Sequence, residues 1–341
     1  MTGLLVHGGA LGDFVLALRI VAVLRRADAD RITILGRPGV ARLALMSDSV
    51  EHVIDLESGG FHRLFVESTI CESEDDESLL RGIDLTVNMM AGGAAGDVLS
   101  RRLGELTGGR VIDLDPRPRA SWRGHVTEQW LHDLKRAGLR IDVGPPRIHV
   151  AREACDGARR DWLSGGPSPR PADGVRRRLV VLAPGSGSRG KCWPLERFVQ
   201  LGQRLAAANQ AVGVLLGPVE QERWSAAERQ SLSGCGAMRV VTAVEELASA
   251  VSAADMYVGN DSGVSHLAAA VGTPTVAIFG PTCPIQWKPL GSHVRIVTSG
   301  TTPDAWPSVE TVFQSVAQPA RSGVNRSRPT SDGTDEHRSK R

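Results

Sequence analysis

The chain has 341 residues, enough for two domains of ordinary size. Hydrophobic residues make up 41% and charged residues 23%, which excludes wholesale disorder and indicates two buried cores. The 40 basic residues nearly cancel 38 acidic ones. A net charge of +2 and an aromatic content of 4% argue against a nucleic-acid partner.

Cysteine usage and hydropathy predict a protein of a reducing, intracellular compartment. The five cysteines are scattered and form no C-x-x-C pair, which argues against a disulfide framework and a zinc site. No apolar run approaches the roughly 18 residues of a membrane span. The first residues also lack the basic region of a signal peptide.

The first half alternates short apolar runs with helical patterns. A buried strand is expected at residues 3–7, followed by a Gly-rich turn, and apolar residues at helical spacing predict a helix at 14–26. Further strands are expected at 31–35, 52–56 and 84–89. Strands that alternate with helices indicate a parallel sheet covered on both faces.

Residues 164–178 are rich in Gly and Pro and lack periodicity, which predicts an exposed linker. This divides the chain into a first domain at 1–163, the linker, a second domain at 179–317 and a polar, disordered tail at 318–341.

The second domain has a clear alternating pattern. Its expected strands are 179–183, 211–217, 238–241, 255–259 and 274–279. Its expected helices are 194–208, 219–231, 244–253, 262–271 and 307–317.

The strand that opens this domain runs into a Gly/Ser loop that could hold a phosphate. Small residues let backbone N–H groups approach an anion, and hydroxyls and an ammonium complete the cradle. Its candidate ligands are Ser186, Gly187, Ser188 and Lys191. The triphosphatase pattern G-x-x-x-x-G-K-[ST] fails only at Cys192, where a thiol replaces the Mg²⁺-binding hydroxyl. A bland turn and a P-loop phosphotransferase are the alternatives.

A second motif joins the strand at 255–259 to its helix. Asp261 or Ser262 is a natural N-cap, so helix capping alone explains part of it. Gly263 frees the first amides for close ligand approach, and His266 lies one turn into the helix. Ligands bind at such strand-to-helix edges of α/β sheets, which favours a binding site.

The third motif is the N-terminal turn with Gly9, Gly12 and Asp13. It lacks the G-x-G-x-x-G spacing of a dinucleotide-binding turn, so a dehydrogenase finds little support. Asp13 can be a first-turn carboxylate favoured by the helix dipole or a general base at the mouth of an inter-domain cleft. The spacing leaves both interpretations open.

Together, the three motifs resemble glycosyltransferase family 9, the ADP-heptose:lipopolysaccharide heptosyltransferases. The resemblance runs from about residue 3 to about 316 and is strongest at 179–290. It implies an α/β GT-B fold, with two Rossmann-like domains whose parallel sheets face across a cleft. The C-terminal domain would hold the sugar nucleotide and the N-terminal domain the acceptor.

The resemblance also implies an inverting transfer in which Asp13 deprotonates the acceptor hydroxyl. Lys191, the Ser186 to Ser188 loop and the amides at 262–263 would stabilise the leaving diphosphate. Neither a metal nor a cofactor is implied.

Further donor contacts follow from the same resemblance. Asp261 would contact donor sugar hydroxyls or order the amides, supported by His266. Glu220 follows a strand, where a carboxylate can accept from ribose hydroxyls, and Glu222 is its rival.

The expected partners are a nucleotide-sugar donor and a saccharide or glycolipid acceptor, with peripheral contact at the cytoplasmic face of a membrane. A catalytically idle sugar-nucleotide-binding module is the alternative of another class. The residue before the first turn, often basic in the family, is here His7. Six arginines suggest an anionic acceptor as readily as a solvated surface: Arg101, Arg102, Arg110, Arg117, Arg119 and Arg123.

Overall fold

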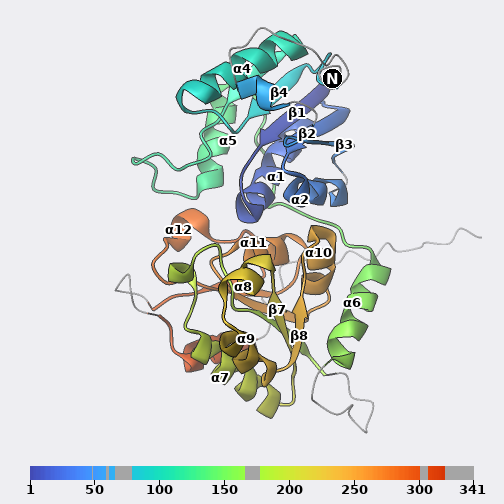
Figure 1. Ribbon diagram of the computed structural model, residues 1–341. Helices are drawn as coiled ribbons and strands as arrows, with labels where there is room; N and C mark the ends of the chain where they lie inside the picture. Colours follow the sequence, from blue (N-terminus) through green and yellow to red (C-terminus); the bar gives the residue numbers. More distant parts are fainter. Residues whose placement is uncertain (48, 59–60, 66–78, 166–176, 300–305, 319–341) are drawn as a thin grey trace, which may run out of the picture.

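The computed structural model describes residues 1–47, 49–58, 61–65, 79–165, 177–299 and 306–318. These residues form two sheets, one in each half of the chain (Figure 1). The first has the strand order β3-β2-β1-β4-β5 and the second the order β11-β10-β9-β6-β7-β8. All neighbouring strands within these ranges run parallel.

Apolar runs form the central strands because both faces of each sheet are covered. In β1, Leu4, Leu5 and Val6 are all fully buried. The strands of the first sheet are β1 (Thr2–His7), β2 (Arg31–Gly36), β3 (His52–Asp55), β4 (Leu85–Asn88) and β5 (Arg110–Asp113). Those of the second are β6 (Leu179–Ala183), β7 (Ala211–Leu216), β8 (Ala237–Val240), β9 (Met256–Asn260), β10 (Thr275–Ile278) and β11 (Val294–Val297).

Helix α1, which follows β1, begins earlier than its apolar pattern predicts. It spans Leu11–Arg26, with Ala10 at the N-cap, so Gly12 and Asp13 lie in its first turn. The other described helices of the first half are α2 (Pro38–Ala41), η1 (Arg42–Met46), η2 (Phe61–Phe65), α4 (Gly93–Thr107) and α5 (Val126–Arg136).

In the second half, the prediction of one helix at 219–231 is wrong, because the structure has two helices there. The chain is extended at Trp224, and Ser225 starts a new helix by accepting a hydrogen bond from the N–H of Glu228. The described helices are α6 (Arg152–Ser164), η3 (Arg189–Lys191), α7 (Leu195–Ala207), α8 (Pro218–Arg223), α9 (Ala226–Ser233), α10 (Val244–Ser252), α11 (Gly263–Ala270), α12 (Pro284–Trp287) and α13 (Val309–Ala317).

Helix α6 precedes the predicted linker in sequence but packs on the second half of the molecule. It lies beside the second half (Figure 1) and contacts α10 and β8. The indole N–H of its Trp162 donates to the Ala250 carbonyl at 3.0 Å. Most of the predicted linker, 166–176, and nearly all of the predicted tail, 319–341, lie outside the described residues. The domain limits therefore stay a prediction.

The two halves meet where α1 crosses α11. A Cβ at Gly263 would lie 2.8 Å from Leu11 Cβ and 2.9 Å from the Gly12 nitrogen, so only glycine lets the two helix starts approach this closely. One cluster of buried apolar residues continues from β1 and α1 into α10 and α11. The amino-terminal ends of α1 and α11 are consequently side by side.

In each sheet the strand order reverses beside the first strand, at β1/β4 and at β6/β9. Ligands of open α/β sheets bind at the carboxyl ends of strands at such a switch point. No helix of the described residues is both long and apolar enough to cross a bilayer.

Candidate active site

Three cavities adjoin one another along the junction of the two halves. The largest, 1220 Å³, lies mainly over the carboxyl edge of the first sheet. A middle cavity of 230 Å³ lies between the first turns of α1 and α11. A third, of 430 Å³, lies over the carboxyl ends of β6 and β7. Asp13 and Trp287 line both the largest and the middle cavity.

The middle cavity brings together residues predicted from motifs far apart in sequence. From the first half come Gly12 and Asp13, and from the second the phosphate-loop residues and the start of α11. The predicted residues that line it are Gly12, Asp13, Ser186, Gly187, Lys191, Asp261, Ser262, Gly263 and His266.

The loop after β6 is tied to the end of β9 by side-chain hydrogen bonds. The Asn260 amide donates to the Pro184 carbonyl at 2.7 Å and accepts from the Trp193 N–H at 2.9 Å. The Ser186 hydroxyl donates to the Asp261 carbonyl at 2.7 Å. Asn260 therefore holds this loop in shape.

Lys191 and Asp261 form an ion pair, with Nζ and Oδ2 3.2 Å apart. Asp261 is buried, whereas the Lys191 side chain is 42% exposed and so open to a ligand. Helix α7 starts only at Leu195, so Lys191 does not open a helix as the lysine of a triphosphatase loop would. The geometry gives the P-loop alternative no support.

Asp13 is more than half buried in the first turn of α1. Burial raises the pKa of its carboxyl group, and nearby Asp261 raises it further. The charge of Lys191 and a hydrogen bond from the Ala10 backbone lower it, without cancelling the effect of burial. A carboxylate with a raised pKa holds a proton more readily, which suits a general base.

His266 lies deep in the same cavity, with 6% of its surface exposed. Burial lowers the pKa of its imidazole to about 3, so the ring is neutral near pH 7. Its Nδ1 is buried and has no hydrogen-bond partner among the residues that the structure describes, and its Cδ2 edge packs towards Gly12. His266 therefore belongs to the contact between the halves as well as to the cavity.

The third cavity distinguishes between the two candidate ribose ligands, because only one of them lines it. Glu220 lines it, and its Oε2 accepts from the Gly217 N–H at 2.8 Å. Glu222 is exposed and lies outside its lining. The walls are otherwise mainly apolar, including Leu215 and Val241, and the cavity is large enough for a nucleoside.

Two other predicted residues lie apart from the middle cavity. Gly9 lines the largest cavity, as expected for a residue of the N-terminal turn. Ser188 is exposed, and it lines none of the three cavities. Its carbonyl instead accepts from the Lys191 N–H at 3.1 Å, which shapes the turn.

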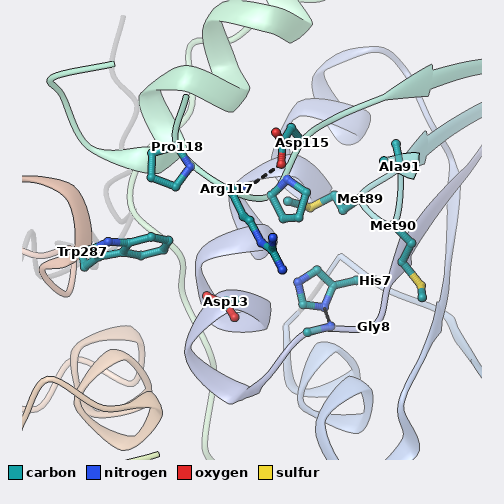
Figure 2. Close-up of a pocket in the computed structure, with 13 residues that line it drawn as sticks. His7, Gly8, Asp13, Met89, Met90, Ala91, Asp115, Arg117, Pro118 and Trp287 are labelled. Atoms are coloured by element: carbon teal, nitrogen blue, oxygen red, sulfur yellow. Dashed lines mark hydrogen bonds between the residues drawn. The ribbon is translucent and has the colours of Figure 1, made fainter. Parts of the chain in front are cut away.

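Besides Gly9 and Asp13, the largest cavity is lined by residues that no motif singled out as a site, Met89 and Trp287 among them (Figure 2). Arg117 extends into it towards His7 and Asp13, while its backbone N–H donates to the Asp115 carboxylate at 2.9 Å. Trp287 enters from the second half, on α12. Of the six arginines suspected of binding an anionic acceptor, only Arg117 lines this cavity.

Within the described ranges, no group of three or more His, Cys, Asp or Glu side chains is placed to hold a metal ion.

The chain has relatives among known protein sequences. Residues 147–315 match the profile of Glycosyltransferase family 9 (heptosyltransferase). Over 175 residues the chain is 29% identical to lipopolysaccharide heptosyltransferase 3 of Escherichia coli K12, covering 50% of this chain and 48% of that one. Over 204 residues it is 29% identical to lipopolysaccharide heptosyltransferase 2 of Salmonella typhimurium, covering 58% and 56%. The chain spans 36% to 56% of the length of these and similar curated relatives.

Among solved structures, the E. coli ADP-heptose lipopolysaccharide heptosyltransferase II superposes with a TM-score of 0.68 at 16% identity, over 93% of this chain and 97% of that one. An E. coli heptosyltransferase solved with ADP gives 0.65 at 19% identity, over 93% and 99%. Likeness at this level of identity shows the fold, and it confirms the expected α/β GT-B architecture.

Proposed function

Because the chain belongs to glycosyltransferase family 9, we propose that it moves a sugar, heptose first among the candidates, from an ADP-linked donor to a lipopolysaccharide-type saccharide, with inversion at the anomeric carbon. The observation that carries this proposal is the position of Asp13. Its carboxyl group stands where the largest cavity meets the middle one, beside a cluster of predicted phosphate ligands.

In this proposal the donor occupies the third and middle cavities. The nucleoside fits between apolar walls with Glu220 towards the ribose, and the diphosphate lies over the first turns of α1 and α11. ADP is a reasonable nucleotide for the donor because a structurally similar heptosyltransferase was solved with ADP. Asp261 and His266 then face the transferred sugar, as their place in the middle cavity allows.

The reaction is a single displacement. Asp13 takes the proton of the attacking acceptor hydroxyl, the new glycosidic C–O bond forms, and the bond from the anomeric carbon to the diphosphate breaks. The departing diphosphate carries the developing negative charge. Lys191, partly exposed although paired with Asp261, and the free N–H groups at the start of α11 are placed to stabilise it.

The acceptor would occupy the largest cavity. Trp287 offers a flat apolar face to a sugar ring, and Arg117 offers a guanidinium to an anionic substituent such as a phosphate or a carboxylate. A lipid-linked acceptor would bring the protein to the cytoplasmic face of a membrane as a peripheral protein.

Asp13→Asn tests the assignment of the base. With ADP-heptose and a heptose-terminated core oligosaccharide, kcat should fall about 1000-fold because the amide cannot accept the proton. The donor Kd from calorimetry should stay within about threefold, and Asp156→Asn on the exposed face of α6 should match the wild type. Loss of donor binding together with turnover would contradict the role of base. Donor binding by the wild type without turnover on any acceptor would instead favour a non-catalytic binding module.

A further inference from the structure

His7 ends β1 and stands in the wall of the largest cavity, with 3% of its surface exposed. Its Nδ1 accepts a hydrogen bond from the Gly9 N–H at 3.2 Å. A backbone amide can only donate, so Nδ1 carries the lone pair. The proton of the neutral ring is therefore on Nε2.

The ring is held neutral and in one orientation. Burial lowers the pKa of His7 to about 4, and the ring makes a T-shaped contact with the Phe14 ring, with their centroids 5.4 Å apart. Among the described residues, the His7 ring has one hydrogen bond, at Nδ1, and none at Nε2. The Nε2–H is thus available to a molecule in the cavity.

The free edge of His7 lies next to Asp13. A Cβ placed on Gly9 would be 3.1 Å from His7 Nε2 and 3.2 Å from Asp13 Cβ, so both side chains border the same point. Figure 2 shows both facing the cavity, with Arg117 extending towards them. A ligand atom that reaches Asp13 from the largest cavity therefore passes close to His7.

We propose that His7 is an acceptor-binding residue whose Nε2–H donates a hydrogen bond to a neutral hydroxyl of the acceptor, adjacent to the hydroxyl that Asp13 deprotonates. This inference rests on the proposed function, and it specifies how the attacking sugar is oriented. A vicinal pair of hydroxyls would span the two side chains, with one oxygen as acceptor for His7 and the other as the nucleophile.

The neutral ring adds no further positive charge beside Asp13. A positive charge beside Asp13 would lower the pKa of that carboxyl group and weaken it as a base. His7 supplies direction without charge, and Arg117 remains for any anionic substituent. The two residues divide recognition of the acceptor between a hydroxyl and an anion.

If His7 only shaped the turn, the bond from Gly9 to Nδ1 would matter and the donor at Nε2 would not. The variants His7→Asn and His7→Gln separate these two roles. In His7→Asn the side-chain oxygen can replace Nδ1 and keep the bond to Gly9, but no donor reaches the position of Nε2. In His7→Gln the longer amide can place an N–H near the position of Nε2 while losing the bond to Gly9. His7→Phe removes both groups and keeps the ring.

The experiment measures steady-state constants for these variants with ADP-heptose and a de-acylated, heptose-terminated core oligosaccharide. We expect the acceptor KM to rise about tenfold in His7→Asn and His7→Phe and to stay within about threefold in His7→Gln, with the donor KM unchanged throughout. The Tm should rank the other way, with Asn above Gln. His52→Phe, on an exposed position of β3, is the matched control and should change neither constant.

The opposite order, with Asn equal to the wild type and Gln impaired, overturns the proposal and leaves His7 as a turn residue. Direct calorimetric titration with the oligosaccharide separates the two levels of inference. If the wild type binds it without transfer, the proposed function fails, and the order of Kd among the variants still decides the role of His7. If the wild type binds no oligosaccharide, both are overturned.

Discussion

The proposed donor side and the proposed acceptor side of the junction are built in different ways. On the donor side, the loop after β6 and the start of α11 are fixed to each other by Asn260 and Ser186. On the acceptor side, the largest cavity has nearly three times the volume of the third and is walled by short loops and by apolar side chains such as Met89 and Trp287. A rigid site suits a constant ligand, the nucleotide, and an open one suits a larger saccharide.

The largest test of this contrast is Gly263→Val, because it acts on the contact that both sides share. The new side chain would meet Leu11 and the Gly12 backbone at under 3 Å and push the two helix starts apart. We expect transfer to fall more than about 100-fold, since a displacement near 1 Å is enough for such a loss. Gly144→Val, where a Cβ meets nothing within 4 Å, is the control. Full activity in Gly263→Val would show that the helix contact is not needed.

Lys191→Met should weaken donor binding without affecting acceptor binding. It removes the cation while keeping much of the side-chain volume, and it leaves the buried Asp261 carboxylate without its partner. ADP should bind about 30-fold more weakly, the magnitude of a charge-assisted hydrogen bond, and the acceptor KM should be unchanged. Lys135→Met, in the last turn of α5, is the matched control. An unaltered Kd for ADP would remove Lys191 from the diphosphate site.

Trp287→Ala addresses the acceptor side from the opposite half of the molecule. Loss of the aromatic face should raise the acceptor KM about tenfold and leave the donor Kd within about threefold. In Trp287→Phe, which keeps an aromatic face, the acceptor KM should stay close to that of the wild type. An effect on the donor constant equal to that on the acceptor constant would mean that the residue serves the middle cavity instead.

The smallest expected effect is a shift in pH dependence. If Asp13 is the base, as proposed, transfer needs its ionised form, and kcat/KM should fall on the acid side with an apparent pKa above that of an ordinary aspartate, in the direction that burial imposes. The sign for stability is opposite. The carboxyl group protonates more easily when folded than when unfolded, so its charge costs stability at neutral pH, and Asp13→Asn should raise the Tm there. That gain should disappear as the pH falls below the pKa of the unfolded chain.

The sequence predicted the residues of the proposed donor side better than those of the proposed acceptor side. The donor side comes from strand ends that are adjacent in the sheet, and each contributes one contiguous motif. Local patterns such as the loop at Lys191 and the turn at Gly263 therefore indicated which residues meet. The split of the helix near Trp224 was missed although Ser225 and Glu228 form a capping box.

The acceptor side could not be predicted in this way because its residues meet through tertiary packing. Trp287 sits on a four-residue helix with no periodicity, and Arg117 could not be told apart from five other arginines. His7 was noticed only as a departure from a basic family position. Its tautomer and its nearness to Asp13 depend on a turn whose geometry no local pattern fixes.

The crossing of lining residues between the halves has a consequence for making chimeras. Trp287, from the second half, lines the largest cavity, proposed for the acceptor, and residues 10–12, from the first half, line the third cavity, proposed for the donor. Exchanging whole halves between relatives would therefore mismatch both cavities at once. A graft meant to change the acceptor alone should carry the segment around α12 with the first half and retain the native turn before α1.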